Sequence, residues 1–441
     1  MKSKVLSFGV ADRPACISRL RELFRSHPPS TIYEEKRKNA FLEIDSMILT
    51  PRSTDEGGLF DIGGPGRNLP DNPLKLLYED MVRDAVKTVR HTVVKEGVLL
   101  VQLYNMGYLV KTPTCTFGFD VTRGPMHHNW KWEVSPKIVE SLADSMDFMC
   151  ITHARDAFHG HAPSIWLHTD HFDHGLTKRM LDRGKKVLVP DGLREHLGDN
   201  RFTYCEDSLS LDLGGIHITP YCGTHCYQDN PYETPLMLFE AITSDGIKLF
   251  FTGDHDYTRL DSFPFKDDID ILILHIGGIS PFFEGRNPND LGDDVDALMQ
   301  GLGIFSSKVV VAGHLAELTH PIGGGREGYF IAWAAFDRLL TERFPARFLI
   351  MFWGEHFHYG RNGKNKVVAS VAKTEKIADL PPNEMIDIPT TTVTGPGHGD
   401  TTDTTTTKTT ATIPSVSSKI AGRKSGRLNF FHKIVNNQPK K

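Results

Sequence analysis

Paired cysteines, long apolar runs and an excess of one charge are all missing from this sequence of 441 residues. Its 6 cysteines include no C-x-x-C pair, which argues against a disulfide framework or a zinc knuckle and favours a reducing compartment. No stretch approaches the roughly 20 apolar residues of a membrane-spanning helix. Asp12 and Arg13 interrupt the N-terminal apolar run, which makes it a poor signal peptide. We therefore predict a soluble, cytoplasmic protein.

The charge balance does not indicate a particular binding partner. The formal net charge is -5, with 24% charged and 39% hydrophobic residues, as expected of a globular protein with one large domain or two. No overall basic field of the kind that nucleic-acid-binding proteins use is present, so the sequence carries no strong nucleic-acid signal. The oligomeric state stays open.

Two regions flank the central part of the chain. Residues 1–96 are predicted to be partly helical and to pack on or extend the core, with helices over 17–24 and 74–95 and a strand over 41–49. Residues 381–441 form a threonine-rich tail, which has too few large apolar side chains to fold and is predicted to be disordered. Its basic end suits either a weak contact with a membrane, nucleic acid or protein, or mere solubilisation.

The central part, residues 97–380, alternates short strands with helices. Apolar, β-branched and aromatic runs predict the strands, and helical spacing predicts the rest. The predicted strands are 98–105, 107–121, 148–152, 187–190, a hairpin over 209–222, 247–257, 269–278, 308–314 and 347–353. The predicted helices are 136–146, 176–184, 293–302 and 327–343.

Histidines and carboxylates gather between residues 149 and 177. Asp170, His171, Asp173 and His174 offer two imidazoles and two carboxylates within five positions. Such mixed nitrogen and oxygen donors suit zinc or manganese. The stretch is therefore interpreted as a metal site.

This stretch resembles the T-H-x-H-x-D-H signature of the metallo-β-lactamase-fold hydrolases. If residues 154–169 are removed, His153 joins Asp170 and the signature is complete. We interpret 154–169 as an insertion, either native or unspliced coding sequence, with His153 as the displaced first ligand and His168 as its rival. The resemblance implies a four-layer αββα sandwich over residues 97–380.

Later motifs follow the order of the same family, in the branch of L-ascorbate-6-phosphate lactonase and the N-acyl phosphatidylethanolamine-hydrolysing phospholipase D. Asp120 occupies the place of an aspartate that braces the site, and His225 follows a hairpin as a third-motif ligand. Asp254 ends an F-T-G-D strand as the bridging carboxylate. His314 takes the last ligand position, with His320 as the fallback.

The resemblance implies two divalent ions, zinc or alternatively manganese. The implied ligands are His153, His171 and His225 for the first ion and Asp173, His174 and His314 for the second, with Asp254 shared. A hydroxide bridging the ions would attack an ester, lactone or phosphodiester of a small or lipid-like substrate, with Asp173 as the catalytic residue that orients it and accepts its proton. The alternative is a catalytically impaired scaffold that binds a partner, because the first motif is split.

Overall fold

A computed structural model describes residues 13–48, 73–124, 134–154, 171–225, 235–255, 268–276, 302, 306–315, 329–343 and 347–360. The helices are α1 (Arg13–Ser26), α2 (Glu35–Ile48), α3 (Pro73–His91), α4 (Pro136–Ser145), α5 (His174–Asp182), η3 (Asp191–Leu193), α6 (Arg194–Leu197) and α8 (Tyr329–Thr341). The strands are β1 (Val98–Gln102), β2 (Tyr108–Lys111), β3 (Thr116–Phe119), β4 (Phe148–Cys150), β5 (Lys186–Pro190), β6 (Thr203–Cys205), β7 (Leu211–Leu213), β8 (Ile216–Gly223), β9 (Leu236–Ile242), β10 (Lys248–Phe251), β11 (Ile269–His275), β12 (Ser307–Gly313), β13 (Arg347–Leu349) and β14 (His356–Tyr359).

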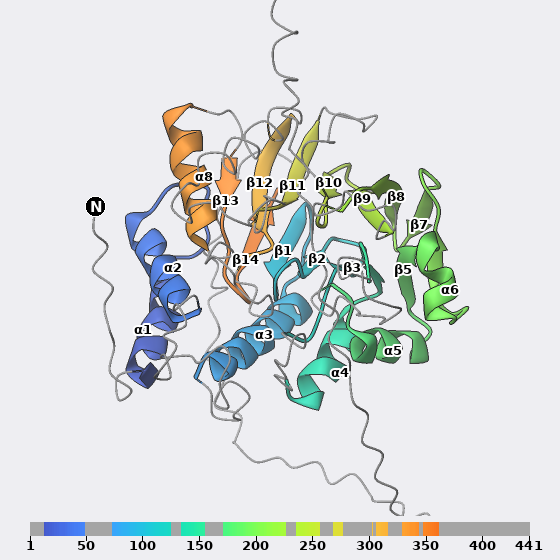
Figure 1. Ribbon diagram of the computed structural model, residues 1–441, viewed down its shortest axis with the longest axis horizontal. Helices are drawn as coiled ribbons and strands as arrows, with labels where there is room; N and C mark the ends of the chain where they lie inside the picture. The colour runs from blue at the N-terminus through green and yellow to red at the C-terminus, as the bar shows by residue number, and fades with distance from the viewer. Residues whose placement is uncertain are drawn as a thin grey trace, which may run out of the picture. The chain divides into compact units, whose positions relative to one another are not determined.

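The strands form two sheets of seven (Figure 1). The first has the order β14-β1-β2-β3-β4-β5-β6 and the second β13-β12-β11-β10-β9-β8-β7. Strands β3 to β6 run parallel in the first sheet, as β10 to β13 do in the second. Parallel strands end at the same edge of a sheet, so the residues that follow them come together.

The two sheets pack face to face. Alternate residues divide between two apolar clusters: Val98 and Leu100 belong to the cluster between the sheets, and Leu99 and Val101 to the outer one. The rings of Phe119 and Phe251 stack between the sheets at a centroid distance of 4.6 Å. This alternation is the period of a β-strand, and it gives each sheet a second apolar face that helices must cover.

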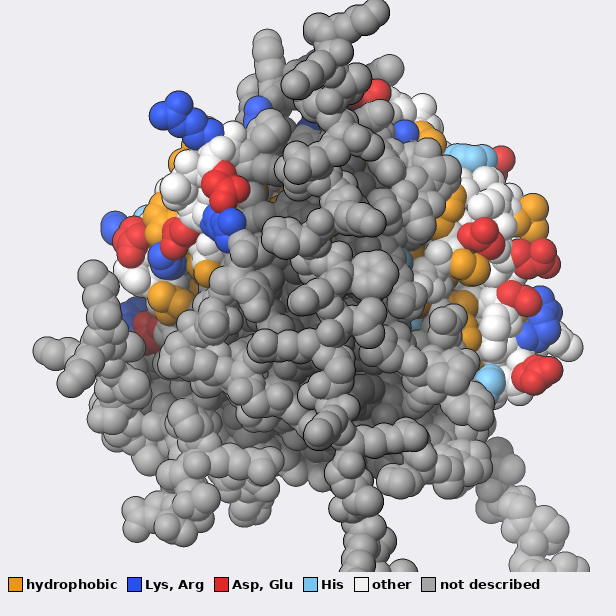
Figure 2. Space-filling view, turned by 45° about the horizontal axis from the view of Figure 1, so that its top comes forward, with side chains coloured by type: hydrophobic (Ala, Val, Ile, Leu, Met, Phe, Trp, Pro, Cys, Tyr) orange, Lys and Arg blue, Asp and Glu red, His pale blue; other side chains and the backbone are white. Residues whose placement is uncertain are grey.

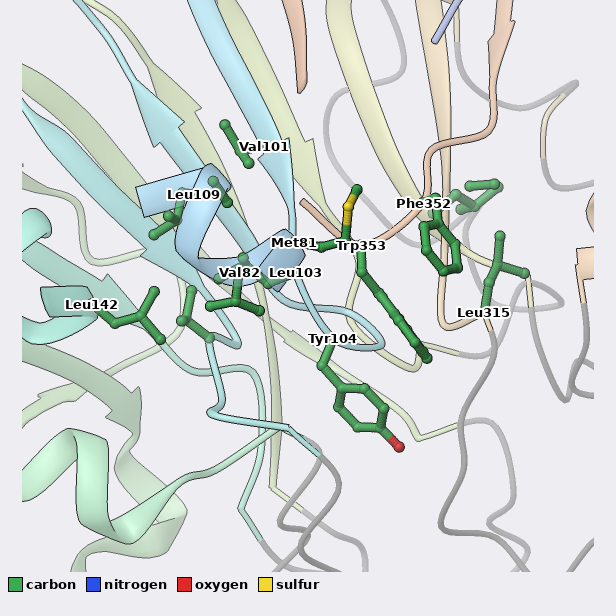
Figure 3. Packing of buried hydrophobic residues seen from close by; sticks show 14 of the residues in the cluster. Met81, Val82, Val101, Leu103, Tyr104, Leu109, Leu142, Leu315, Phe352 and Trp353 are labelled. Carbon is green, nitrogen blue, oxygen red and sulfur yellow. The ribbon is translucent and has the colours of Figure 1, made fainter. Parts of the chain in front are cut away.

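Helices supply the outer layers. Helices α3, α4 and α5 lie side by side along the first sheet (Figure 1), α3 contacts β1, and Met81 of α3 lies beside Trp353 (Figure 3). Helix α8 covers the second sheet, with Phe336 5.5 Å from Phe348 of β13 between ring centroids. The predicted αββα sandwich is thereby confirmed.

The N-terminal helices join this core. The rings of Phe24 in α1 and Phe352 stack at 4.6 Å. Arg37 of α2 forms a buried, two-pronged ion pair with Glu355, with nitrogen to oxygen distances of 2.7 and 2.8 Å. Contacts between α1 and α3 and between α2 and α8 complete the connection. Residues 13–48 are thus part of the folded unit.

The observed elements differ from the predicted ones in several places. The predicted strand 41–49 is wrong, because its residues lie in helix α2: Phe41 and Ile44 are both buried and three positions apart, which is a helical spacing. Strands β6, β9 and β14 were not predicted, and β14, which contains His356 and His358, pairs with β1. A short apolar run alone does not distinguish a strand from a helix.

The described surface carries both charge signs. On the face in Figure 2, acidic and basic side chains are interspersed, and a few apolar ones lie among them. Among the described helices, none is long and apolar enough to cross a membrane. Most of the predicted helix 293–302, the inserted residues 155–169 and the tail from 381 lie outside the described residues.

Candidate metal centre

The first half of the centre is built where β3 and β4 end. The two strands are parallel, with Phe119 opposite Cys150, so Asp120 comes to lie beside Thr152. The Asp120 carboxylate accepts hydrogen bonds from the Thr152 backbone N–H (2.7 Å) and the Thr152 hydroxyl (2.6 Å). It also lies 2.8 Å from Nδ1 of His171. One buried carboxylate therefore fixes both the loop after β4 and the imidazole of His171.

These hydrogen bonds determine which nitrogen of each imidazole can bind a metal. An ionised carboxylate only accepts, so His171 donates from Nδ1 and carries its lone pair on Nε2. The Thr152 hydroxyl donates its single proton to Asp120. It must therefore accept a hydrogen bond from Nδ1 of His153, which lies 3.0 Å from the hydroxyl oxygen. His153 then also has its lone pair on Nε2. Asp120 thus sets His171 directly and His153 through Thr152.

The second half lies where β10, β11 and β12 end. Asp254 follows β10, His275 ends β11 and His314 follows β12. The parallel register places His275 opposite Gly313, the residue before His314, and the two rings are 4.3 Å apart between centroids. Each of the three side chains is almost completely buried.

Asp254 lies at the middle of the combined cluster. Its Oδ2 is 3.1 Å from Nε2 of His171 and 3.4 Å from Nε2 of His314. Nε2 of His153 and Nε2 of His225 each lie 3.7 Å from the same oxygen. The two sheets therefore direct imidazole nitrogens from four separate segments at one carboxylate.

Gly253 allows this approach. It has a φ of 51°, in the left-handed region that glycine tolerates best. A Cβ at this position would lie 2.7 Å from Cγ2 of Thr152, too close for a real contact. The residue before Asp254 must be small for β10 to end against the loop of β4.

The electrostatics of the cluster favour ligand forms of its groups. Burial raises the pKa of Asp254, but the nearby imidazoles of His171, His314 and His275 outweigh it and hold that pKa well below the usual value. Burial and the neighbouring His314 lower the pKa of His275 well below its usual value. An ionised carboxylate and neutral imidazoles are the forms that coordinate metal ions.

The donor set fits one or two metal ions. Two groups, His153 with His171 and Asp254, and Asp254 with His275 and His314, each place their candidate ligand atoms within 4.8 Å of one another. Within the described part of the chain, Oδ1 of Asp254 is buried with no hydrogen-bond partner. A buried oxygen in this state is costly unless a cation or water satisfies it.

Five of the predicted ligands come together: His153, His171, His225, His314 and Asp254. His153 is fully buried, and its ring lies 4.1 Å from that of His171 between centroids, although the printed sequence separates them by the inserted segment. Its rival His168 and the fallback His320 lie outside the described residues.

Two predicted ligands lie apart from both groups. Asp173 caps the N-terminus of α5 and forms an ion pair with Arg123. His174, the first residue of α5, is exposed. Their roles as ligands, and that of Asp173 in catalysis, stay predictions.

Sequence reasoning missed His275 as a site residue. His275 closes the strand next to the one that leads to His314, and a polar residue ending a buried parallel strand was the available signal. His255 is buried, and its Nδ1 accepts a hydrogen bond from the Thr224 backbone N–H at 3.0 Å. It therefore supports the loop that carries His225.

No protein-family model matches the chain, and no curated protein matches it significantly. Among solved structures, it is similar to a possible metal-dependent hydrolase from Veillonella parvula, with 14% identity, a TM-score of 0.41 and coverage of 60% of this chain and 100% of that one. An isothiocyanate hydrolase from Delia radicum gut bacteria has 16% identity, a TM-score of 0.40 and coverage of 59% and 99%.

The YhfI protein from Bacillus subtilis, described as having the metallo-β-lactamase fold, has 14% identity, a TM-score of 0.37 and coverage of 60% and 100%. Likenesses at this level carry no argument about activity. The architecture rests on the chain's own two facing seven-stranded sheets with helices outside, and on its histidines and aspartates gathered where parallel strands end. The chain thus forms an αββα sandwich, which is the architecture that the resemblance in its sequence implies.

Proposed function

We propose that this protein is a metal-dependent hydrolase. The observation that carries the proposal is the buried cluster in which imidazoles from four segments surround Asp254, with Asp120 fixing two of them. Burying so many titratable groups is costly for a protein, and a bound cation would offset that cost. A cluster of this kind is typical of a metal centre.

The residues of the cluster would contribute different kinds of metal ligand. Imidazole Nε2 atoms of His153, His171 and His225 supply neutral donors, while Asp254 supplies negative charge. This mixture suits zinc, with manganese as the alternative. A bound divalent ion of this type lowers the pKa of water toward about 7 and polarises a substrate oxygen.

The proposed substrates are esters, lactones or phosphodiesters, small or lipid-like. Hydrolysis at a carbonyl or phosphoryl centre is the chemistry that such a centre accelerates without a nucleophilic side chain. The sequence agrees, since it has no G-x-S-x-G nucleophile motif.

A panel of three substrates tests the proposal: p-nitrophenyl acetate, a γ-lactone and bis(p-nitrophenyl) phosphate. The protein is purified, stripped with a chelator and reconstituted separately with Zn²⁺ and Mn²⁺. We expect metal-dependent turnover of at least one substrate, and its loss in His171→Ala. His217→Ala is the matched control, because His217 is an exposed histidine that pairs with Asp212. Full reconstitution without turnover of any of the three would contradict the proposal.

The rival interpretation is a scaffold without activity, and it depends on displacement of His153 by the inserted residues. His153 instead lies within the cluster, with its Nε2 3.7 Å from Asp254, which favours the hydrolase. If His153→Ala keeps both bound metal and turnover, this support fails and the first ligand lies elsewhere.

A further inference from the structure

We propose that the second ion is held by Asp254, His275 and His314, while Arg123 keeps Asp173 out of the coordination set. The inference rests on the proposed metal-dependent function and specifies its second site. It departs from the ligands that the signature implies, because Asp173 and His174 are replaced by a histidine from another strand. The ligand class is a divalent first-row transition metal ion, since the donors are two imidazoles and one carboxylate.

The Asp173 carboxylate is already saturated by hydrogen bonds. Its Oδ2 accepts from the backbone N–H of Arg123 at 2.9 Å and from Nε at 2.8 Å. Its Oδ1 accepts from Nη2 of Arg123 at 2.9 Å and from the Leu176 backbone N–H at 3.0 Å. A two-pronged guanidinium pair is among the strongest that a carboxylate makes, so an ion must compete with a cation already in place.

This ion pair lies against the start of helix α5. Gly175, two residues after Asp173, lies against the guanidinium, and a Cβ there would be 2.9 Å from Cζ of Arg123. The Asp173 side chain also caps α5, which ties its carboxylate to the start of that helix. Moving Asp173 to a metal would break the ion pair and the helix cap together.

His275 occupies a better position for a ligand. The register of β11 and β12 fixes its backbone, with His275 opposite Gly313 and the Ile276 N–H donating to the Gly313 carbonyl at 3.0 Å. Its side chain is fully buried, and a nitrogen of His275 falls within 4.8 Å of ligand atoms of Asp254 and His314. His174, by contrast, is exposed at the first position of α5.

Metal stoichiometry separates the two ligand sets. The full chain is stripped and titrated with Co²⁺, whose visible spectrum reports the ligands, and with Zn²⁺, counted by mass spectrometry after gel filtration. We expect the wild type to bind two ions per chain. His275→Ala should lose at least one with a changed Co²⁺ spectrum, and His174→Ala should keep both.

His275→Gln and circular dichroism guard against a variant that fails to fold. His217→Ala should keep both ions with an unchanged spectrum. A wild type that saturates with one ion, or a folded His275→Ala chain that keeps two, would overturn the inference. If the variants bind metal as expected but no hydrolysis is detected, the proposed function is contradicted and the second metal site is supported. If the protein hydrolyses a substrate but His174 is the essential ligand of the second ion, the proposed function is supported and the second metal site is contradicted.

Discussion

The two halves of the metal cluster are positioned in different ways. In the first, hydrogen bonds between side chains orient the ligands: Asp120 holds His171 directly and His153 through Thr152. In the second, the backbone ladder of two parallel strands places His275 beside His314. Asp254 lies between the halves and belongs to both groups.

The difference suggests what each half tolerates. Side-chain hydrogen bonds can hold His153 even though a long segment follows it, because they act on the imidazole and not on the chain beyond. A ladder tolerates changes in neighbouring side chains, since its hydrogen bonds are made by the backbone. We therefore expect single substitutions of the side chains that orient the first-half ligands to weaken metal binding at the first site selectively.

The largest effect is expected from Asp254→Ala, which removes the ligand common to both halves. Metal affinity should fall at both sites by more than the roughly 10- to 100-fold cost of losing an outer hydrogen-bond partner. Calorimetric titration with Zn²⁺ measures this loss. Asp212→Ala is the control, because that carboxylate is exposed. Retention of either site at full affinity would show that Asp254 is not shared.

Asp120→Asn should weaken the first site alone. The amide is similar in size, but its NH₂ group accepts no hydrogen bond. Asparagine must therefore lose either the bond that Oδ1 accepts from the Thr152 backbone N–H or the bonds that Oδ2 accepts from the Thr152 hydroxyl and His171. We expect an affinity loss of about 10- to 100-fold in the first half and little change in the second. Two-phase Co²⁺ titration resolves the halves, and equal weakening of both would remove the distinction between them.

Thr152→Val and Thr152→Ser form a matched pair. Valine keeps the shape but removes the hydroxyl that links Asp120 to His153, whereas serine keeps the hydroxyl. Of the two hydrogen bonds that the hydroxyl makes, the one to His153 orients a ligand, and its loss is worth about 1 kcal/mol. We therefore expect roughly fivefold weaker binding for valine and near-normal binding for serine. The same titration measures it. If the two variants bind alike, His153 is not oriented through Thr152.

Gly253→Ala should have the smallest effect on metal and a clear one on stability. A left-handed φ costs about 1–2 kcal/mol for alanine, and the new Cβ would also press on Thr152. Gly184→Ala is matched to it, since Gly184 has a φ of 69° with nothing within 4 Å of an added Cβ. Denaturant unfolding should show a larger loss for Gly253→Ala. Equal losses would mean that the Thr152 contact carries no energy.

Much of the fold follows from the sequence. Buried strands such as β10 and β12 are apolar runs that lead into a glycine followed by a candidate ligand, so their place in the chain can be predicted from the sequence. The sequence did not predict helix α2, because the helical spacing of its apolar residues is explained only by their packing on α8. Helix α8 lies nearly 300 residues further along the chain.

The site is harder to foresee than the fold. His153, His171 and Asp254 belong to motifs, and their proximity follows from motif order. Arg123 lies 50 residues before Asp173, and no local sequence pattern predicts their ion pair. His275 carries no motif and becomes a candidate ligand only because β11 lies between β10 and β12 in the sheet.

The positions of the bound ions test the two-site arrangement most directly. Crystals of the Zn²⁺-reconstituted full chain, measured at the zinc absorption edge, locate each ion by anomalous scattering. We expect one ion touching His153, His171 and Asp254, and a second touching Asp254, His275 and His314. Zinc found only at Asp173 and His174, or only on the surface, would contradict it.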